Sequence, residues 1–419
     1  MDTNAVVPST GLVDAVACAE SSSALPIEVA NIWRYTAGLT WIKLSVEIAD
    51  IWVVRDDASG DYSYGGTRLV PHNTSDALVL EQLERLALYE SALKNRLINR
   101  VLEKPELFSQ RAAWPTGFVE SRIGGARCLI RPRDAAAEAI LSDPTSEHFV
   151  ETILPLLRRI GPVLNECGGK IKLTPDFGHF AGLSDLLHEV TEHTLGISRE
   201  RGGCGGKTRF SSYGVIAAME QLGALVDRHV PVTLIGSAGA MGMDILHYFL
   251  NEEFSDIAVC DLKYESDPTL LPAHVQYLPA HAGRFTDECL KRGGVIVATT
   301  VGQELENSHW GLIPPGTQFF LAHNLSVPVG EPGKALMRQL QAQGVYALPG
   351  QMLTLGGALT SRLEWFFRRQ RTPDQLFDKP MAYATIKEVL QLLAREIDQL
   401  ARDTGITPYE AMLLYIEQA

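Results

Sequence analysis

The sequence predicts an α/β protein of two domains, with a parallel sheet in its second half. Two observations carry this prediction. Residues 232–261 read as a short apolar strand, a turn with three glycines, a helix and a second apolar strand that ends in an acid. Strand-like and helical segments also alternate on both sides of this unit, and 419 residues are enough for two hydrophobic cores.

Each part of residues 232–261 suits the binding of a dinucleotide. Gly236 and Gly239 allow a tight turn beside a pyrophosphate, and Gly242 allows close packing of helix on strand. The helix start offers free N–H groups to phosphates. Asp261, about 20 residues beyond the last glycine, is placed to bind the adenosine ribose. We therefore predict a Rossmann-type domain, although an ordinary strand–helix turn is the alternative for an isolated glycine triplet.

The predicted cofactor is NAD rather than NADP. Asp261 would accept a hydrogen bond from a ribose 2′-hydroxyl and would repel a 2′-phosphate. Lys263 lies close in sequence and would weaken that preference. The glycine spacing is G-x-x-G-x-x-G rather than the common G-x-G-x-x-G, so Gly236 stands one residue ahead of the usual first glycine and Ser237 occupies that glycine's position.

Composition excludes several classes of partner. The formal net charge of −13 argues against nucleic acid and anionic membranes. No apolar run approaches the ~20 residues that span a bilayer. Six scattered cysteines without a C-x-x-C pair indicate reduced thiols, so we expect a cytoplasmic protein with no metal site. Residues 1–26 lack a basic stretch and are expected to form a flexible arm.

The remaining elements follow from periodicity and turn residues. In the first half we expect strands in residues 31–54, 117–131 and 170–176, helices in 75–101, 144–167 and 184–196, and turns or loops in 56–64, 104–120 and 201–207. In the second half we expect a helix over 210–229, strands at 232–235, 256–261, 295–299, 318–321 and 346–348, and helices in 357–369 and 387–419.

Several ordered motifs resemble the glutamate/leucine/phenylalanine/valine dehydrogenase family, most closely its leucine and phenylalanine branch. The matching segments are 64–68 (YGGTR), 94–95 (KN), 123–127 (IGGAR), 174–178 (TPDFG), 194–198 (TLGIS) and 211–215 (SSYGV), with Asn324 and Gly356-Gly357 near the late motifs. The resemblance covers about residues 45–370. It implies an N-terminal α/β substrate domain, a Rossmann domain and a cleft between them.

The resemblance also sets the expected domain boundaries and the cofactor contacts. The substrate and oligomerisation domain would comprise 27–205 plus 360–419, and the NAD-binding domain 206–359. The expected cofactor contacts are Ser211, Gly236, Ser237, Ala238, Gly239, Ala240, Met241, Gly242, Asp261, Leu262, Thr299, Thr300 and Asn324. Because the family assembles through its substrate domain, the resemblance implies a homo-oligomer.

One departure from the family affects the chemistry. The family's catalytic lysine corresponds to Arg127, which keeps its charge and cannot act as a base. The resemblance assigns carboxylate binding to Lys94 and proton transfer to Asp176. Lys172 and Lys207 could compensate for the missing lysine, although both could also be solvated surface charges. In an extended segment, Lys172, Thr174 and Asp176 would share one face.

The expected substrate pocket is polar. Tyr64, Thr174, Ala358 and Ser361 stand where leucine-preferring relatives have aliphatic residues, and Gly65 and Gly66 lie beside the substrate in the resembled motif. A compact aliphatic substrate would leave voids and unpaired hydroxyls, so an aromatic or polar one is favoured.

Two functions follow from these observations. The first is an NAD-dependent oxidoreductase that transfers a hydride between nicotinamide and the α-carbon of an amino acid, or of the imino or keto acid, with a reductase of specialised metabolism as a variant. The second is a catalytically inactive dinucleotide-binding homologue that serves as a sensor or assembly partner. Asp176 and the cofactor turn favour the first function, whereas Arg127 favours the second.

Overall fold

The computed structural model describes residues 34–36, 38–57, 60–175, 182–281, 284–285, 287–300 and 310–417. The chain forms two compact units, named here unit 1 and unit 2. Unit 1 comprises Met1–Arg96, Glu120–Gly206 and Arg368–Phe377; unit 2 comprises Leu97–Val119, Lys207–Phe367 and Asp378–Ala419. Residues 1–33 of unit 1 and residues 418–419 of unit 2 lie outside the described residues.

Unit 1 contains a six-stranded sheet in the order β1-β2-β3-β5-β4-β6. Its strands are β1 (Arg34–Thr36), β2 (Leu39–Val46), β3 (Ala49–Asp56), β4 (Tyr62–Leu69), β5 (Ile123–Pro132) and β6 (Ile171–Pro175). The first four in this order pair antiparallel, whereas β4 runs parallel to both β5 and β6. The carboxyl ends of β4, β5 and β6 therefore lie at the same edge of the sheet.

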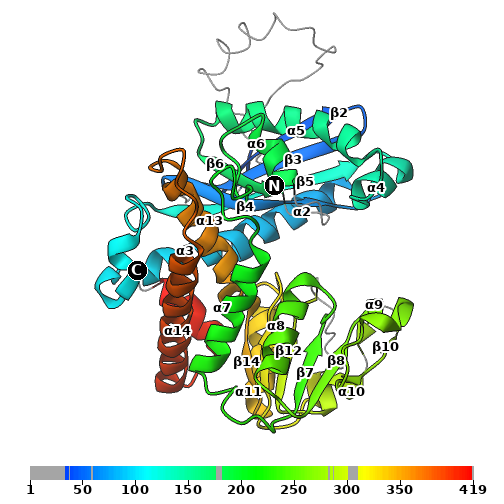
Figure 1. Cartoon of the computed structure of the whole chain (residues 1–419), viewed down its shortest axis with the longest axis vertical. Helices are drawn as coiled ribbons and strands as arrows, with labels where there is room; N and C mark the ends of the chain where they lie inside the picture. Colours follow the sequence, from blue (N-terminus) through cyan, green and yellow to red (C-terminus); the bar gives the residue numbers. More distant parts are fainter. Residues whose placement is uncertain are drawn as a thin grey trace, which may run out of the picture. The chain divides into compact units, whose positions relative to one another are not determined.

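One face of this sheet forms the hydrophobic core of unit 1. Alternate residues such as Ile51, Val53, Cys128 and Ile130 are fully buried there. They pack with α4 (Ala135–Ser142), α5 (Phe149–Glu166) and α6 (Leu183–His188), and Figure 1 shows α5 and α6 above the strands. Because side chains alternate along a strand, the residues between these point to the opposite face.

The opposite face packs against α2 (Asp76–Leu86) and the π-helical segment η1 (Ala87–Ala92). The helix α3 (Leu93–Val101) follows η1 directly along the chain. A Cβ added to Gly125 of β5 would lie 2.2 Å from the Ala87 carbonyl oxygen and 2.5 Å from the Ala92 nitrogen. Only glycine therefore allows η1 to approach β5 so closely.

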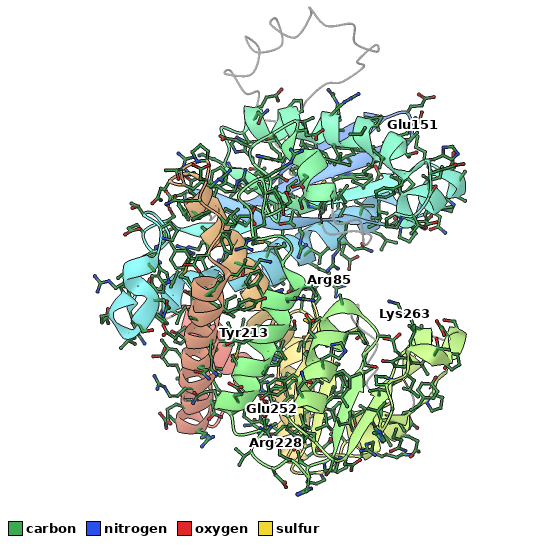
Figure 2. All side chains as sticks on the ribbon, viewed as in Figure 1. Arg85, Glu151, Tyr213, Arg228, Glu252 and Lys263 are labelled. Carbon is green, nitrogen blue, oxygen red and sulfur yellow. The ribbon has the colours of Figure 1, made fainter. Side chains whose placement is uncertain are left out.

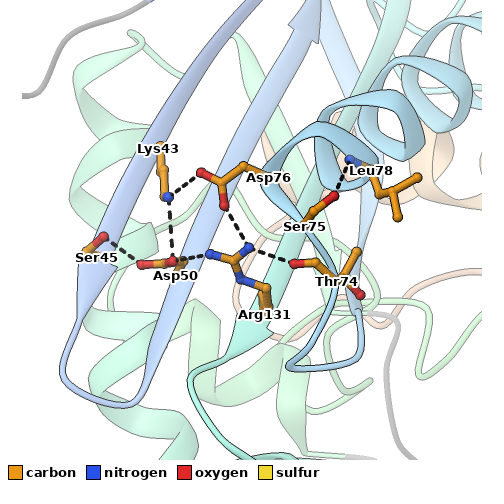
Figure 3. Close-up of polar contacts among 8 residues, drawn as sticks. All are labelled: Lys43, Ser45, Asp50, Thr74, Ser75, Asp76, Leu78 and Arg131. Atoms are coloured by element: carbon orange, nitrogen blue, oxygen red, sulfur yellow. Dashed lines mark hydrogen bonds and ion pairs between the residues drawn. The ribbon is translucent and has the colours of Figure 1, made fainter.

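Charged side chains fasten the start of α2 to the sheet (Figure 3). The Ser75 hydroxyl caps the helix by accepting from the Leu78 amide at 3.3 Å. Asp76 accepts from Lys43 Nζ at 2.8 Å and from Arg131 at 2.7 Å. These contacts fix the position of the helix that leads into η1 and α3.

Unit 2 is built on a parallel sheet in the order β14-β13-β12-β7-β8-β9. The strands are β7 (Val232–Ile235), β8 (Ile257–Cys260), β9 (Gln276–Tyr277), β12 (Val295–Ala298), β13 (Gln318–Leu321) and β14 (Tyr346–Leu348). Within the unit this is the 3-2-1-4-5-6 order of the dinucleotide-binding fold. The predicted α/β class with a Rossmann-type sheet is therefore confirmed.

The other elements of unit 2 are mostly helices (Figure 1). They are α7 (Thr208–Gln221), α8 (Ala240–Asn251), α9 (Leu262–Ser266), α10 (Asp287–Lys291), α11 (Glu331–Ala342), α12 (Gly350–Leu353), α13 (Leu355–Arg368), α14 (Lys379–Thr404) and α15 (Pro408–Glu417). Short 3₁₀ turns are η2 (Pro105–Leu107), η3 (Ser109–Ala113), η4 (Pro268–Leu270) and η5 (Trp310–Leu312), and β10 (Ala280–His281) pairs with β11 (Arg284–Phe285). None of the helices in the described ranges is both long and apolar enough to cross a membrane.

Residues 97–119 belong to unit 2 although they come from the first half of the chain. The buried Arg362 guanidinium of α13 donates to the Phe118 carbonyl at 2.6 Å and to Asn99 Oδ1 at 2.7 Å. Trp114 Nε1 donates to Thr385 Oγ1 of α14 at 2.8 Å. These long-range contacts depend on the tertiary fold, so the sequence offered no local signal for them.

The last helices also group differently from our expectation. We expected residues 360–419 to return to the first domain, but residues 378–417 pack in unit 2. A Cβ on Gly214 of α7 would lie 3.4 Å from Leu390 and 3.5 Å from Ile386, which shows how closely α14 packs on α7. Lys387 also pairs with Glu220 at 2.9 Å.

Some local expectations need correction. The turn expected over residues 56–64 ends earlier, since β4 begins at Tyr62 and pairs with two neighbours. The helix expected over 184–196 ends at His188, because Leu195 N instead donates to the Leu173 carbonyl at 3.0 Å. Helices α4 and α11 were not expected. The final helix is two helices, with Gly405 at φ +71° ending the first.

Candidate functional site

The turn after β7, called here the phosphate turn (residues 236–242), depends on three glycines in three ways. Gly236 has φ +80°, a conformation that L side chains rarely adopt. A Cβ on Gly242 would lie 2.2 Å from the Gly236 carbonyl oxygen and 2.7 Å from Ser237 Cα. Gly239 is the N-cap of α8, and its Cβ would lie 3.3 Å from the same oxygen. The turn therefore brings the N-terminus of α8 close to the end of β7.

Asp261 lies against the phosphate turn, as the strand order requires. It caps α9, accepting from the Lys263 amide at 3.0 Å and from the Ala238 amide at 2.9 Å. The exposed Lys263, labelled in Figure 2, donates from Nζ to the Ala238 carbonyl at 3.2 Å. An acid and a lysine thus flank the same residue of the turn, and Leu262 between them is 49% exposed.

The next strand contributes two threonines to the same edge. Thr299 follows β12, and its hydroxyl donates to the Gly236 carbonyl at 2.9 Å. A Cβ on Gly236 would lie 3.2 Å from Thr300 Cγ2. The strand order reverses between β7 and β12, which is where ligands bind in sheets of this type. Asn324, half-buried, follows β13 at the next position in the sheet.

Other predicted residues of unit 2 lie on helices. A Cβ on Gly357 of α13 would lie 2.6 Å from Ser211 Oγ of α7, so these two helices are in close contact. Ser361 is buried and donates to the Gly357 carbonyl at 3.0 Å, while Ala358 is half-buried. In the phosphate turn, Ala240 is exposed and Met241 is half-buried.

Sequence reasoning missed two polar residues at this edge. The Tyr264 hydroxyl accepts from Ser237 Oγ at 3.2 Å, and both side chains are buried. His323, which follows β13, is also buried, with Nδ1 3.2 Å from the Ala298 carbonyl oxygen. The signal for Tyr264 was its place one helical turn beyond Asp261.

In unit 1, predicted substrate residues share the sheet face that packs against α2 and η1. Tyr64 of β4 pairs with Gly125 of β5 and with Lys172 of β6. Gly66 pairs with Thr174, whereas Gly65 points the other way, where a Cβ would lie 1.6 Å from the Ala126 carbonyl oxygen. The expectation that Lys172 and Thr174 share a face is confirmed.

Lys94 and Arg127 lie in a group of charged side chains, called here the cation group (Arg68, Lys94, Arg127 and Glu90), in which Arg68 is half-buried and the others are buried. Lys94 pairs with Glu90 at 2.5 Å; Glu90 is fully buried and Arg127 is 5% exposed. Burial lowers the pKa of Lys94, the charge of Glu90 opposes this, and the charges of Arg127 and Arg68 lower it further. The four side chains carry three cations and one carboxylate, so the group favours an anion.

Lys172 belongs to a different group on the same face. Its Nζ donates to the Gly169 carbonyl and lies 4.6 Å from the centre of the Tyr62 ring, near the amino ends of β6 and β4. Burial lowers the pKa of Lys172 to about 7, with Glu192 opposing this and two arginines adding to it. Lys172 is therefore held away from the carboxyl edge, toward which Thr174 lies.

Asp176, which is the predicted catalytic carboxylate, lies outside the described residues together with Phe177 and Gly178. Among the described residues, no group of three or more His, Cys, Asp or Glu side chains could hold a metal ion. Lys207, the other lysine considered, is the N-cap residue of α7.

Comparison with solved structures identifies the fold. The chain is similar to L-tryptophan dehydrogenase from Nostoc punctiforme, with a TM-score of 0.60 and 12% identity over 90% of this chain and 94% of that one. It is similar to the hetero-hexameric glutamate dehydrogenase from Thermus thermophilus in its Leu-bound form, with a TM-score of 0.63 and 16% identity over 91% and 87%. For glutamate dehydrogenase from Peptoniphilus asaccharolyticus the values are 0.54 and 14% over 90% and 88%.

At these identities the likeness shows the fold alone. No protein family model matches the sequence, and no curated protein matches it. The chain thus has the fold of the amino acid dehydrogenases, as the ordered motifs indicated, and its chemistry has to be argued from its own residues.

Proposed function

We propose that the protein is an NAD-dependent oxidoreductase of the amino acid dehydrogenase type. Its substrate would be an amino acid, or the corresponding imino or keto acid, with an aromatic or polar side chain. The observation that carries this proposal is the contact of Asp261 with the phosphate turn at 2.9 Å, within a sheet of Rossmann order. The likeness in fold to amino acid dehydrogenases supports it.

The residues of unit 2 fit a dinucleotide. The N-terminus of α8 and the close-packed turn suit a pyrophosphate. Asp261 already accepts two backbone N–H bonds, and a carboxylate has lone pairs left to accept from a ribose hydroxyl. Its negative charge disfavours a 2′-phosphate, so we propose NAD over NADP. When bound, this cofactor would supply or accept the hydride.

The cation group fits a substrate carboxylate. Arg127 and Arg68 keep their charge throughout the physiological range. In this buried setting their attraction for a carboxylate is stronger than at the surface. We propose that Arg127 holds the carboxylate or the oxygen that gains negative charge.

Lys94 is the better candidate for the proton exchange that Arg127 cannot perform. Its pKa is lowered by burial and by the two neighbouring arginines, so its neutral form is more accessible than that of an exposed lysine. Glu90 at 2.5 Å holds the ammonium in place. Lys172, held at the other end of the strands, is the weaker candidate. Asp176 remains the proposed proton-transferring carboxylate of the matched segment.

The side-chain preference rests on two residues in unit 1. Tyr64 is 4% exposed and Thr174 is 5% exposed, and they lie on the face that carries Arg127. A phenol and a hydroxyl at these positions suit an aromatic or polar substrate better than a compact aliphatic one, which offers no polar group to either. Ala358 and Ser361 are proposed to add to this preference.

The test is a fluorescence titration of the full chain with NADH, followed by NADH oxidation assays with a panel of keto acids plus ammonia. We expect saturable NADH binding, weaker NADPH binding, and turnover with aromatic or polar keto acids. Asp176→Asn should abolish turnover and leave NADH affinity unchanged. Absence of NADH binding would contradict the proposal as a whole. Unchanged turnover in Asp176→Asn would contradict the catalytic role proposed for Asp176.

A second function is favoured by Arg127, which replaces the residue that exchanges protons in the resembled family. In this alternative the protein binds the dinucleotide and an amino or keto acid without converting them, as a sensor or assembly partner. NADH binding that responds to keto acids without NADH oxidation would support it. In either case we propose a cytoplasmic homo-oligomer, and light scattering that gives about 46 kDa would contradict the oligomer.

A further inference from the structure

The strongest unassigned feature lies beneath the phosphate turn. Ser237 is fully buried and Tyr264 is 3% exposed, and their hydroxyl oxygens are 3.2 Å apart. Ser237 donates this bond and the Tyr264 oxygen accepts it. One of these hydroxyls belongs to the phosphate turn itself, whose side-chain contacts from other segments include those of Asp261, Lys263 and Thr299.

The two hydroxyl groups carry two hydrogens, and their mutual bond uses only one. The hydrogen of the Tyr264 hydroxyl has no acceptor among the described residues. Buried hydroxyl donors are nearly always satisfied, since leaving one without an acceptor is costly. An acceptor that belongs to a ligand is one way to satisfy it.

The surroundings of Tyr264 keep it a donor in a fixed position. Burial raises the pKa of Tyr264, and the nearby charge of Asp261 also raises it, so the phenol keeps its proton. Its ring packs edge-on against Tyr277 at 6.1 Å, and the Tyr277 hydroxyl donates to Glu265 at 3.3 Å. Tyr264 is therefore braced by Tyr277 and by Ser237.

We propose that the Tyr264 hydroxyl, positioned by Ser237, donates a hydrogen bond to an oxygen of the adenosine half of the bound dinucleotide. The inference rests on the proposed cofactor site and adds a determinant of affinity to it. The adenosine half is the relevant one because Tyr264 follows Asp261 on α9, on the β8 side of the phosphate turn. Ser237 would then serve to position the Tyr264 hydroxyl, a role that a glycine of the common G-x-G-x-x-G pattern could not fill.

The test measures the Kd for NADH of four full-length proteins by fluorescence titration: wild type, Tyr264→Phe, Ser237→Ala and the matched control Tyr277→Phe. We expect Tyr264→Phe to bind about tenfold more weakly, because one donor to a charged or hydroxyl oxygen is lost. Ser237→Ala should lose about two- to threefold, because the Tyr264 hydrogen remains but its orientation is no longer fixed. Tyr277→Phe should stay within about twofold, because its hydroxyl bonds to Glu265.

Two further measurements separate binding from folding. Competition with ADP-ribose should show the same loss in Tyr264→Phe, whereas competition with nicotinamide mononucleotide should not. Tyr264→Phe also removes the acceptor of the buried Ser237 hydroxyl, so its thermal midpoint without ligand should fall, and the titrations are run at a temperature where every variant is folded.

The outcomes distinguish this inference from the proposed function. Wild-type binding of NADH with an unchanged Kd in Tyr264→Phe overturns the inference alone and indicates that water is the acceptor. A loss in Tyr264→Phe that is restricted to nicotinamide mononucleotide also overturns it. No binding of NADH by wild type overturns the proposed cofactor site together with the inference.

Discussion

The phosphate turn of unit 2 and the cation group of unit 1 are built in opposite ways. The turn is made by backbone, with three glycines that allow close approach and with Asp261 held to Ala238 at 2.9 Å. The cation group is made by long side chains from β4, β5 and the η1–α3 segment, gathered by sheet register and burial. A site made of backbone depends on local spacing, whereas a site made of side chains depends on the packing of distant segments.

The largest effect should follow from removing the proton-exchanging group of the cation group. Lys94→Gln should lower turnover by about 10²–10⁴-fold, the usual contribution of such a group, and leave the Kd for NADH unchanged. Steady-state assays with the best keto acid and parallel NADH titrations would measure this.

Lys172→Met is the matched control, because Lys172 is also a buried lysine of unit 1 but its ammonium lies with Gly169 and Tyr62. It should retain turnover within about threefold, since a lysine outside the reacting group contributes no proton transfer. If Lys172→Met loses turnover and Lys94→Gln does not, the assignment of the two lysines is reversed.

The second effect concerns the phosphate turn. Gly242→Ala should destroy the close contact of α8 with the phosphate turn, since its Cβ would lie 2.2 Å from the Gly236 oxygen. Overpacking of this kind costs about 1–3 kcal/mol, so NADH should bind about 5- to 100-fold more weakly. Gly311→Ala is the control, because a Cβ there meets nothing within 4 Å. Equal NADH affinity in both variants would show that the turn does not hold the cofactor.

The comparison also explains what the sequence could predict. Gly236, Gly239, Gly242 and Asp261 lie at fixed spacings, and the structure brings Asp261 to the turn as that spacing required. Lys94 pairs with Glu90 four residues earlier in the same helical stretch, which is a local contact. The placement of Arg127 and Arg68 near this pair and of Lys172 away from it depends on the register of β4, β5 and β6, which no local pattern contains.

The same reasoning applies to the fold. The strands of the Rossmann-type sheet followed from apolar runs between turn residues, and the structure supplies their order. The grouping of residues 97–119 with unit 2 did not, because it depends on single contacts such as that of Arg362 with the Phe118 carbonyl. Long-range hydrogen bonds of buried side chains leave no periodic signal in sequence.

The third effect would sharpen the cofactor assignment of the turn. Wild type should bind NADH more tightly than NADPH, and Asp261→Ser should lower that ratio by about tenfold, because a carboxylate that accepts from a 2′-hydroxyl is removed. Competitive titration of both nucleotides would measure the ratio. Lys263→Ala should change it in the other direction, by removing a cation beside Ala238. Tighter binding of NADPH by wild type would contradict the role given to Asp261.

The fourth effect is a pH dependence that belongs to unit 1. Lys172 has a pKa of about 7 in the folded chain against an ordinary value of 10.5. Between these values the unfolded chain holds a proton that the folded chain lacks, so the free energy of unfolding should rise as pH increases from about 7 toward 10. The slope from one group is at most about 1.4 kcal/mol per pH unit. Urea unfolding at several pH values should show this rise in wild type and a smaller one in Lys172→Met; identical slopes would indicate that Lys172 keeps its proton.

The smallest effect concerns how the cation group is supported from a distance. Asp76 accepts from Lys43 at 2.8 Å and from Arg131 at 2.7 Å, and these hydrogen bonds, that of Lys43 first, lower the pKa of Asp76. Its side chain is 53% exposed, so Asp76→Asn should cost only about 0.5–1 kcal/mol at neutral pH. Because the folded pKa lies below the ordinary 3.8, this stability should be lost as pH falls below about 4, and the variant should then match wild type.

The same variant tests whether α2 supports the site beyond its own stability. Since α2 leads directly into η1 and α3, which carry Glu90 and Lys94, a loosened α2 should raise the KM for the keto acid about twofold without changing kcat. The Kd for NADH should not change, because the phosphate turn is held by contacts within its own unit. A change in NADH affinity without a change in KM would contradict the view that α2 supports the cation group and not the phosphate turn.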